Sequence, residues 1–404
     1  MQSCHYLYLK VVYKMLYNYL EFPILKMNKG EGLKIKSNQS NKKKKSDLWF
    51  YIVVIILIIV ISLLTLRKMG FLKLWIDNQP SSLVMEMDSD TRERRANYQI
   101  INAHEHIQSM DNIPLLLEVM EDCQIEKMVF LGTSKFTFYL NPDYGYTEYD
   151  KNNEEIINMC KKYPDKFLAL ATINPNDDNK LDKLKAFIAA GAKGLKLYNG
   201  HGNFYDLFFK MPLDDPGMME VYRYCEEEEI PILYHINSGR FLAEFERILK
   251  AFPDLVVVAP HFALTSRNLT LLSRLLDTYP NLYTDISFGH PDFQVAGFKR
   301  ISQNSEGFKR FMQKYSDRIT FGTDIVITTY RAKSRSYLDD VTLSYFDMLE
   351  KEKFTLPRSI YNMMSKTARG NTDPNNVYNG LHLDDEILKK IYHDNPEKIF
   401  WKSE

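Results

Sequence analysis

The chain has 404 residues, of which 45% are apolar and 26% are charged, a composition typical of a globular enzyme. Lys plus Arg and Asp plus Glu both total 52, so the formal net charge is zero and no overall basic field favours nucleic acid as a partner. The 4 cysteines form no C-x-x-C pair, and we expect no disulfide framework.

Residues 1–47 differ in composition from the rest of the chain. They include the lysine run at 42–45 and few acidic residues. We expect a basic leader that is largely disordered. A start of translation at Met27 rather than Met1 is a hypothesis that a native peptide spanning residues 26 and 27 would contradict.

Residues 48–66 form an uncharged, mostly apolar run that is close to the about 20 residues of a membrane-spanning helix. Trp49 and Tyr51 stand at one end, as interfacial aromatic residues do. More basic residues precede the run than follow it, which predicts a single-pass anchor in the lipid bilayer with a cytoplasmic N-terminus and an extracytoplasmic catalytic domain. Residues 67–97 are predicted to be a tether that partly docks on the following domain.

Residues 98–404 alternate short apolar runs with segments of helical spacing. Strands that alternate with helices predict parallel pairing and right-handed crossovers, and eight repeats predict an α/β fold of the (β/α)₈ TIM-barrel type. An open doubly wound sheet is the alternative, although no Gly-x-Gly-x-x-Gly follows the first run. The predicted strands are 99–103, 127–132, 167–173, 192–198, 231–236, 255–260, 282–287 and 319–325.

The first apolar run ends in His104 and His106. Alternate side chains of a strand share a face, so both imidazoles should point the same way, with Asn102 beside them and Glu105 on the other face. Two adjacent imidazoles suit one divalent metal ion. A chance pair is the alternative, because the chain has 9 histidines.

Other predicted strands also end in polar side chains, where a barrel of this kind places its chemistry. One divalent ion is predicted, with Zn²⁺ preferred and Mn²⁺ compatible. Asp324 is the expected proton shuttle for a metal-activated water. His261 is expected to assist by polarising a carbonyl, by stabilising developing negative charge or by binding a second metal. The predicted metal ligands are His104, His106, His235 and Asp324.

Four further side chains are predicted to bind substrate. Lys196 alternates with two leucines and should face the barrel interior, where it binds a substrate carboxylate, pairs with an acid or bridges two metals as a carbamate. The others follow predicted strands and should reach the same pocket: Tyr198, His201 and His290.

Seven segments, in this order, resemble the amidohydrolase superfamily. They are Asn-Ala-His-Glu-His at 102–106, Gly-Leu-Lys-Leu-Tyr at 194–198, Ile-Leu-Tyr-His at 232–235, Pro-His at 260–261, Leu-Tyr-Thr-Asp at 282–285, Phe-Gly-Thr-Asp at 321–324 and Asn-Pro-Glu-Lys-Ile-Phe at 395–400. The closer likeness is to the amidohydrolase-related branch, which includes metal-dependent hydrolases and aminocarboxymuconate-semialdehyde decarboxylase.

The resemblance covers about residues 97–402 and implies a distorted barrel. It also implies metal ligation by His104, His106, His235 and Asp324, and a catalytic role for His261. Asn102 departs from the pattern, since the family usually has Asp there.

We therefore expect a membrane-tethered, metal-dependent hydrolase. A metal-activated water would attack an amide, ester or lactone-like bond of a small carbonyl substrate. The alternative is a non-oxidative decarboxylase of a small carboxylic acid on the same site. A catalytically silent binding barrel is disfavoured, because it has no reason to keep convergent polar groups. Aromatic loops fit either a pocket wall or the contact of a homodimer.

Overall fold

The computed structural model describes residues 52–65, 78–328 and 333–401. The chain divides into two compact units, residues 1–70 and residues 71–404. In the first unit, residues 52–65 form a helix. Over the three described ranges, no helix combines the length and the apolarity needed to cross a membrane. The leader at 1–47 and both ends of the proposed anchor at 48–66 lie outside the described residues.

The second unit is built on nine short strands, all parallel, in one curved sheet. The spatial order is β8-β7-β6-β5-β4-β3-β2-β1-β9. Every predicted apolar run contributes a strand, so the structure is an α/β, TIM-barrel-like fold as predicted. The strands are β1 Ile100–Ile107, β2 Ile125–Leu131, β3 Phe167–Thr172, β4 Gly194–Gly200, β5 Ile232–Ile236, β6 Val257–Ala259, β7 Leu282–Asp285, β8 Ile319–Thr320 and β9 Ile325–Ile327.

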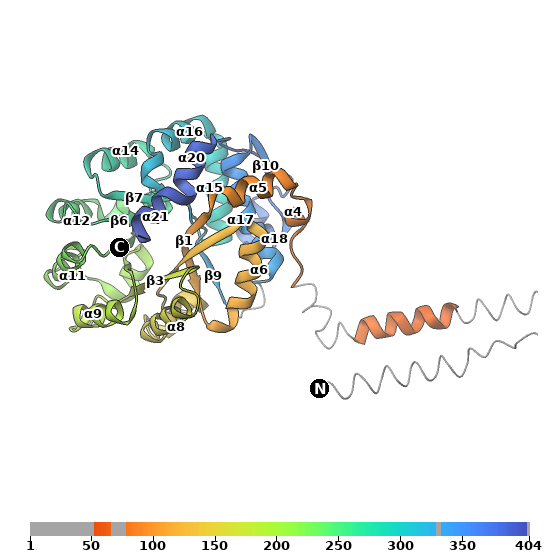
Figure 1. Ribbon diagram of the computed structural model, residues 1–404, viewed down its shortest axis with the longest axis horizontal. Helices are drawn as coiled ribbons and strands as arrows, with labels where there is room; N and C mark the ends of the chain where they lie inside the picture. Colours follow the sequence, from red (N-terminus) through yellow and green to blue (C-terminus); the bar gives the residue numbers. More distant parts are fainter. Residues whose placement is uncertain (1–51, 66–77, 329–332, 402–404) are drawn as a thin grey trace, which may run out of the picture. The chain divides into compact units, whose positions relative to one another are not determined.

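Helices follow the strands and surround the sheet (Figure 1). The larger helices are α5 Ser89–Tyr98, α6 Ile113–Cys123, α8 Tyr149–Lys162, α9 Lys180–Ala190, α11 Pro216–Glu227, α12 Ser238–Ala251, α14 Leu269–Thr278, α15 Pro291–Gln303, α16 Ser305–Lys314 and α17 Arg335–Glu350. Short helices or turns include α4 Ser82–Glu86, α7 Lys135–Tyr139, α10 Gly202–Phe204, η3 Tyr205–Phe209, α13 Pro260–Ala263, α18 Arg358–Met363, α19 Lys366–Gly370, α20 Asp385–Lys389, η5 Lys390–Asp394 and α21 Asn395–Phe400. A small antiparallel pair, β10 Lys353–Thr355 and β11 Val377–Asn379, lies outside the barrel sheet.

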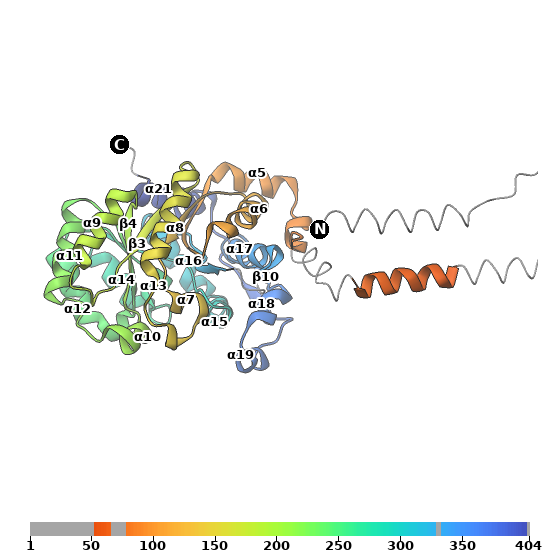
Figure 2. The same ribbon diagram turned by 90° about the horizontal axis from the view of Figure 1, so that it is seen from below.

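The two ends of the barrel carry different elements. Helices α7 and α10, which follow β2 and β4, lie at one end, and α21 lies at the other (Figure 2). The first end is therefore the one toward which the parallel strands run, where this architecture places its functional groups.

The eighth predicted strand is divided, which corrects the expectation of a continuous strand at 319–325. Its first part, β8, pairs with β7, and its second part, β9, pairs with β1. Between them the chain still bonds to β1, because Ala103 N donates to Phe321 O at 2.9 Å and Asp324 N donates to His104 O at 2.8 Å. The interruption closes the barrel and turns Asp324 toward its interior.

Strand β1 also differs from its predicted bounds. It continues to Ile107, because β9 pairs with residues 105–107. A register shift between Asn102 and Glu105 in the pairing with β2 breaks the expected alternation of faces. The Asn102 amide therefore does not accompany the histidines and instead donates to Glu105 Oε1 at 2.6 Å.

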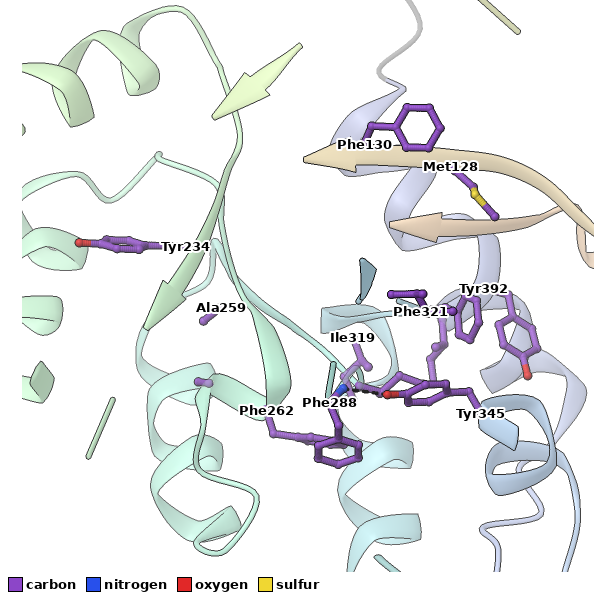
Figure 3. Close-up of a cluster of buried hydrophobic side chains, with 14 of the residues drawn as sticks. Met128, Phe130, Tyr234, Ala259, Phe262, Phe288, Ile319, Phe321, Tyr345 and Tyr392 are labelled. Atoms are coloured by element: carbon purple, nitrogen blue, oxygen red, sulfur yellow. Dashed lines mark hydrogen bonds between the residues drawn. The ribbon is translucent and has the colours of Figure 1, made fainter. Parts of the chain in front are cut away.

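Buried aromatic side chains support the strand ends near the site. Phe262 stacks on Phe288 with ring centroids 5.8 Å apart, and the Phe288 backbone N donates to Tyr345 OH at 2.8 Å (Figure 3). On the other side of the same cluster, Phe321 stacks on Phe346 at 5.1 Å. These packed rings hold the segments that follow β6, β7 and β8.

Residues 78–97, the described part of the predicted tether, fold as α4 and α5 and dock on α17. Arg95 is buried and bonds Glu350 through Nη2 at 3.0 Å. The Ser81 backbone N donates to Asp339 Oδ2 at 2.9 Å. Residues 67–77 lie outside the described residues, so the tether as a whole stays a prediction.

Candidate metal centre and active-site cavity

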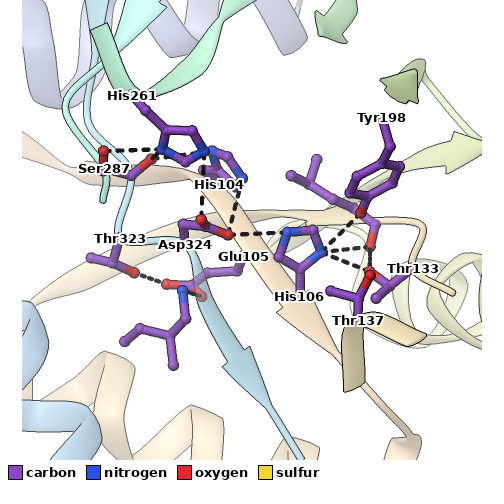
Figure 4. Close-up of polar contacts among 12 residues, drawn as sticks. His104, Glu105, His106, Thr133, Thr137, Tyr198, His261, Ser287, Thr323 and Asp324 are labelled. Carbon is purple, nitrogen blue, oxygen red and sulfur yellow. Dashed lines mark hydrogen bonds and ion pairs between the residues drawn. The ribbon is translucent and has the colours of Figure 1, made fainter. Parts of the chain in front are cut away.

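Three histidines surround the Asp324 carboxylate inside the barrel (Figure 4). Nε2 of His104 and Nε2 of His106, both from β1, lie 3.2 Å and 3.1 Å from Asp324 Oδ1. Nε2 of His261, which follows β6, lies 3.6 Å from Asp324 Oδ2. One ligand atom each from His104, His261 and Asp324 lies within 4.8 Å of the others, so this group could bind a metal ion.

The outer ring nitrogen of His104 and that of His261 both face acceptors. His104 Nδ1 lies 2.6 Å from Asp285 Oδ2. His261 Nδ1 lies 3.0 Å from the carbonyl oxygen of Ser287. Neither acceptor carries a proton of its own, so the hydrogen-bond network assigns N–H to both Nδ1 atoms. The Nε2 lone pairs of both rings then point toward Asp324.

His106 has the same tautomer for a similar reason. Its Nδ1 lies 2.6 Å from Thr133 Oγ1, and that hydroxyl donates to the Leu131 carbonyl oxygen at 2.6 Å. Because the hydroxyl proton is used there, Nδ1 of His106 must donate to Thr133, and Nε2 again presents its lone pair to Asp324.

These orientations fit a bound cation. Lone pairs that face a carboxylate at close range repel it unless a positive charge lies among them. Nε2 of His104 is buried and, among the described residues, has no hydrogen-bond partner. Outward Nδ1–H bonds of this kind are the usual way in which metal-binding histidines are oriented. The donor set could therefore hold a divalent metal ion through mixed nitrogen and oxygen ligands.

The charge states also suit ligation. Burial lowers the pKa of His106 to about 4 and that of His235 well below its ordinary value, so both rings are neutral at pH 7. Burial acts to raise the pKa of Asp324, but His104 and His106 outweigh it and hold that pKa well below its ordinary value. Asp324 is thus an anion, and the His106 and His235 imidazoles are neutral. Burial acts to lower the pKa of His104, but the charges of Asp324 and Asp285 outweigh it and raise that pKa.

The backbone at this site is unusual. His261 begins four successive residues with positive φ, ending at Leu264 (φ 54°), which form a left-handed turn that L-residues rarely adopt. Asp324 also has a positive φ of 55°. Only glycine fits at position 289, because a Cβ there would collide with Asp324 Oδ2. At position 322, a Cβ would lie 2.7 Å from that of His104.

His235, the predicted fourth ligand, lies beside this group and not within it. Its ring centroid is 4.7 Å from that of His261 and 4.3 Å from that of His201. It lines the same cavity. Metal coordination by His235 and by His106 stays a prediction.

A cavity of about 790 Å³ opens onto this centre. All four residues predicted to bind substrate line it. Lys196 is fully buried, and its Nζ has no hydrogen-bond partner in the described part of the chain. Burial lowers the pKa of Lys196 to about 8, and its Nζ lies 4.9 Å from the centre of the Tyr198 ring.

The other three predicted substrate residues also have local partners. Tyr198 OH donates to the Gly132 carbonyl oxygen at 2.9 Å. His201 Nδ1 accepts the Asn203 N–H at 3.1 Å and caps α10. His290 Nδ1 accepts an N–H at 3.3 Å and caps α15. His201 and His290 can therefore contact substrate only with Nε2 or the ring, and Tyr198 only with a lone pair of its hydroxyl oxygen or with its ring.

Several residues of the site were not predicted to belong to it. Glu105 is buried, and its Oε2 accepts the Ile325 N–H at 2.9 Å, so it positions the chain next to Asp324. Burial raises its pKa well above the ordinary value. The sequence feature that could have identified Glu105 is a carboxylic acid within an otherwise apolar predicted strand. Asp285 lies in one of the segments that carry the family resemblance, but its role as the His104 partner was not predicted. No pattern in the sequence identified the others, which are Thr133, Arg267, Arg300 and Lys333.

No curated protein matches this chain by sequence. Among solved structures, it is similar to an uncharacterised TIM-barrel protein from Bordetella bronchiseptica (19% identity, TM-score 0.47, covering 77% of this chain and 89% of the other). It is also similar to 2,6-dihydroxybenzoate decarboxylase from Rhizobium (15%, 0.42, 75% and 98%) and to 5-carboxyvanillate decarboxylase from Sphingomonas paucimobilis (11%, 0.44, 75% and 99%).

The family model described as Amidohydrolase (Amidohydro_2) matches residues 125–401. This range includes His235, His261 and Asp324 and begins after the histidine pair of β1. The chain therefore belongs to the Amidohydro_2 family and is an enzyme of the amidohydrolase superfamily.

Proposed function

We propose that this protein is a metal-dependent lyase that removes a carboxyl group from a small carboxylic acid without oxidation. The observation that supports it is Lys196, a fully buried ammonium group with no hydrogen-bond partner in the described residues, on the wall of the cavity that holds Asp324 and His261. Burying an unpaired cation costs free energy, and a substrate carboxylate would supply the missing partner.

The reaction requires a proton at the carbon that loses carbon dioxide. The carbon–carbon bond to the carboxylate breaks, its electron pair stays on the organic fragment, and that carbon takes up one proton. Asp324 Oδ2 and His261 Nε2, which are 3.6 Å apart, are placed to hold and deliver this proton. A bound divalent ion would supply positive charge to stabilise the developing negative charge.

Hydrolysis of an amide, ester or lactone-like bond, the leading prediction from the sequence, is the second candidate. It is favoured by the position of Asp324, which lines the cavity and has Oδ1 3.2 Å from Nε2 of His104, so that its carboxylate could accept a proton from water. A neutral carbonyl substrate, however, offers no carboxylate to pair with the Lys196 ammonium group.

The test is the product. Metal-loaded full-length protein is incubated with small aromatic and aliphatic carboxylic acids, and separately with amides, esters and lactones, while carbon dioxide and hydrolysis products are measured. We expect carbon dioxide from an acid, with kcat/KM reduced about 10- to 100-fold in Lys196→Met, which removes a charged hydrogen bond. His104→Gln and Asp324→Asn should lose both metal, measured by elemental analysis, and activity. Hydrolysis without carbon dioxide release would overturn the proposal.

A further inference from the structure

The charged wall of the cavity is strongly one-sided. Among the described residues that line it, histidines apart, the charged side chains are four cations and one carboxylate, and that carboxylate, Asp324, already faces the histidine cluster. The cations are Lys196, Arg267, Arg300 and Lys333. A cavity with this charge balance attracts anions. Its excess of positive charge is larger than the single negative charge of one substrate carboxylate.

The cations lie at two different depths. Lys196 is fully buried on β4, beside the histidine cluster. Arg300 on α15 is only partly buried, and Arg267, in the segment between α13 and α14, is exposed. The two arginines therefore lie at the outer part of the cavity and Lys196 at the inner part.

The two arginines come from adjoining parts of the cavity wall, because Arg300 contacts Ser266, the residue before Arg267. Arg300 Nη1 donates to Ser266 Oγ at 2.7 Å, which fixes its guanidinium group. Burial first, and then the charge of Arg267, lower the pKa of Arg300, so the two cations repel each other. In the part of the chain that the structure describes, neither forms an ion pair with a carboxylate.

Their surroundings on the cavity wall are apolar. Leu264, Phe293 and Ala296 line the cavity with the arginines, and Phe288 lines it nearer to the centre. Paired guanidinium groups beside apolar surface are well suited to binding a carboxylate, because each can donate two parallel N–H bonds. The repulsion between them is relieved when an anion binds.

We propose that Arg267 and Arg300 form a second anion subsite, and that the substrate is a small dicarboxylic acid whose two carboxylates are joined by an apolar or aromatic spacer. One carboxylate binds at the inner end near Lys196, and the other binds between the arginines. The loss of one carboxylate as carbon dioxide rests on the proposed function, whereas the binding of a carboxylate at each end of the cavity does not. The apolar wall between the subsites contacts the spacer.

The test is a comparison of matched acids by calorimetry with the metal-loaded full-length protein. The probes are isophthalate, terephthalate, adipate and suberate, each compared with the monoacid that lacks one carboxylate: benzoate for the aromatic pair, hexanoate and octanoate for the others. We expect at least one diacid to bind about 10-fold or more tightly than its monoacid, as one charged hydrogen-bonded contact predicts. Arg267→Gln and Arg300→Gln should each remove most of this preference and leave monoacid affinity unchanged.

The control is Arg310→Gln, which removes an exposed arginine of α16 that does not line the cavity. Arg267 is exposed, so its variant tests the subsite even if the Arg300 variant is unstable. Equal affinity for diacids and monoacids, or a preference that survives both substitutions, would overturn the subsite. Arginine-dependent binding of diacids without carbon dioxide release would instead overturn the proposed reaction and keep the subsite.

Discussion

At the scale of single residues, the site is organised by what holds the ring nitrogens of the histidines. Asp285 and Ser287 accept the outer N–H groups of His104 and His261, and Thr133 accepts that of His106. All three Nε2 atoms therefore face one carboxylate. This shared orientation suits the binding of a cation, since each supporting hydrogen bond keeps a lone pair directed inward.

Substitution of Gly289, which packs against Asp324, tests how closely the Asp324 carboxylate is held in place. In Gly289→Ala, the added methyl group would collide with Asp324 Oδ2, and the position has a positive φ of 68°. We expect at least a 10-fold loss of metal affinity, of the order seen when supporting contacts of metal ligands are removed, measured by competition with a chelator. Gly370→Ala is the matched control, because nothing lies within 4 Å of the added atom. Equal metal affinity in the two variants would contradict the assigned site.

At the scale of elements, irregular backbone supplies the functional groups. Asp324 comes from the break between β8 and β9, and His261 from the left-handed turn after β6. Regular strands could not direct these two side chains toward the histidines of β1. The conformational free energy of these strained residues is offset by packing in the buried aromatic cluster around Phe288 and by backbone hydrogen bonds such as Asp324 N to His104 O.

The contact between the segment before α4 and helix α17 predicts a pH dependence of stability. Asp339 on α17 accepts the Ser81 N–H, and burial raises the pKa of Asp339 from 3.8 to about 8. Between these pH values the folded protein binds more protons than the unfolded chain, so this group lowers the free energy of unfolding as the pH rises from about 4 to about 8.

Asp339→Asn keeps the acceptor and removes the charge. We expect its free energy of unfolding to depend less on pH, and to exceed that of the wild type at pH 8 by up to a few kcal/mol. Urea unfolding at several pH values measures this. Asp165→Asn, at an exposed position, is the control and should follow the wild type. If the difference in free energy of unfolding between Asp339→Asn and the wild type does not grow between pH 5 and pH 8, the raised pKa of Asp339 is refuted.

At the scale of the whole molecule, closure of the barrel brings together residues from β1 and from the segment just before β9, the first and last strands of the barrel sheet. The histidine pair of β1 meets Asp324, which lies more than two hundred positions later, through pairing of β1 with β9. The anchor at 48–66, the cytoplasmic N-terminus and homodimer formation remain proposals at this scale.

Removal of residues 1–70, the first compact unit, should leave the barrel folded with its metal affinity unchanged. The described fold of the second unit begins with α4, whose preceding residue Ser81 already bonds to Asp339. We expect the Tm to change by less than about 4 °C, which corresponds to less than about 1 kcal/mol. If the full chain sediments with membranes and the truncated protein does not, the result would support the proposed membrane anchor. An unfolded truncated protein would show that the first unit is part of the fold.

The sequence by itself determined the alternation of strands and helices, the barrel class and the polar strand ends, because period, punctuation and apolar runs are local properties. It placed His104, His106, His261 and Asp324 at one end of the barrel for the same reason. Only the tertiary structure decided the division of the eighth strand, the length of β1 and the partners of each ring nitrogen. Those features depend on which strand lies beside which, and a break such as that at Asp324 has no local signature. The arginine pair shows this most clearly: Arg267 and Arg300 are ordinary surface residues in sequence, and only folding brings their charges together beside the cavity.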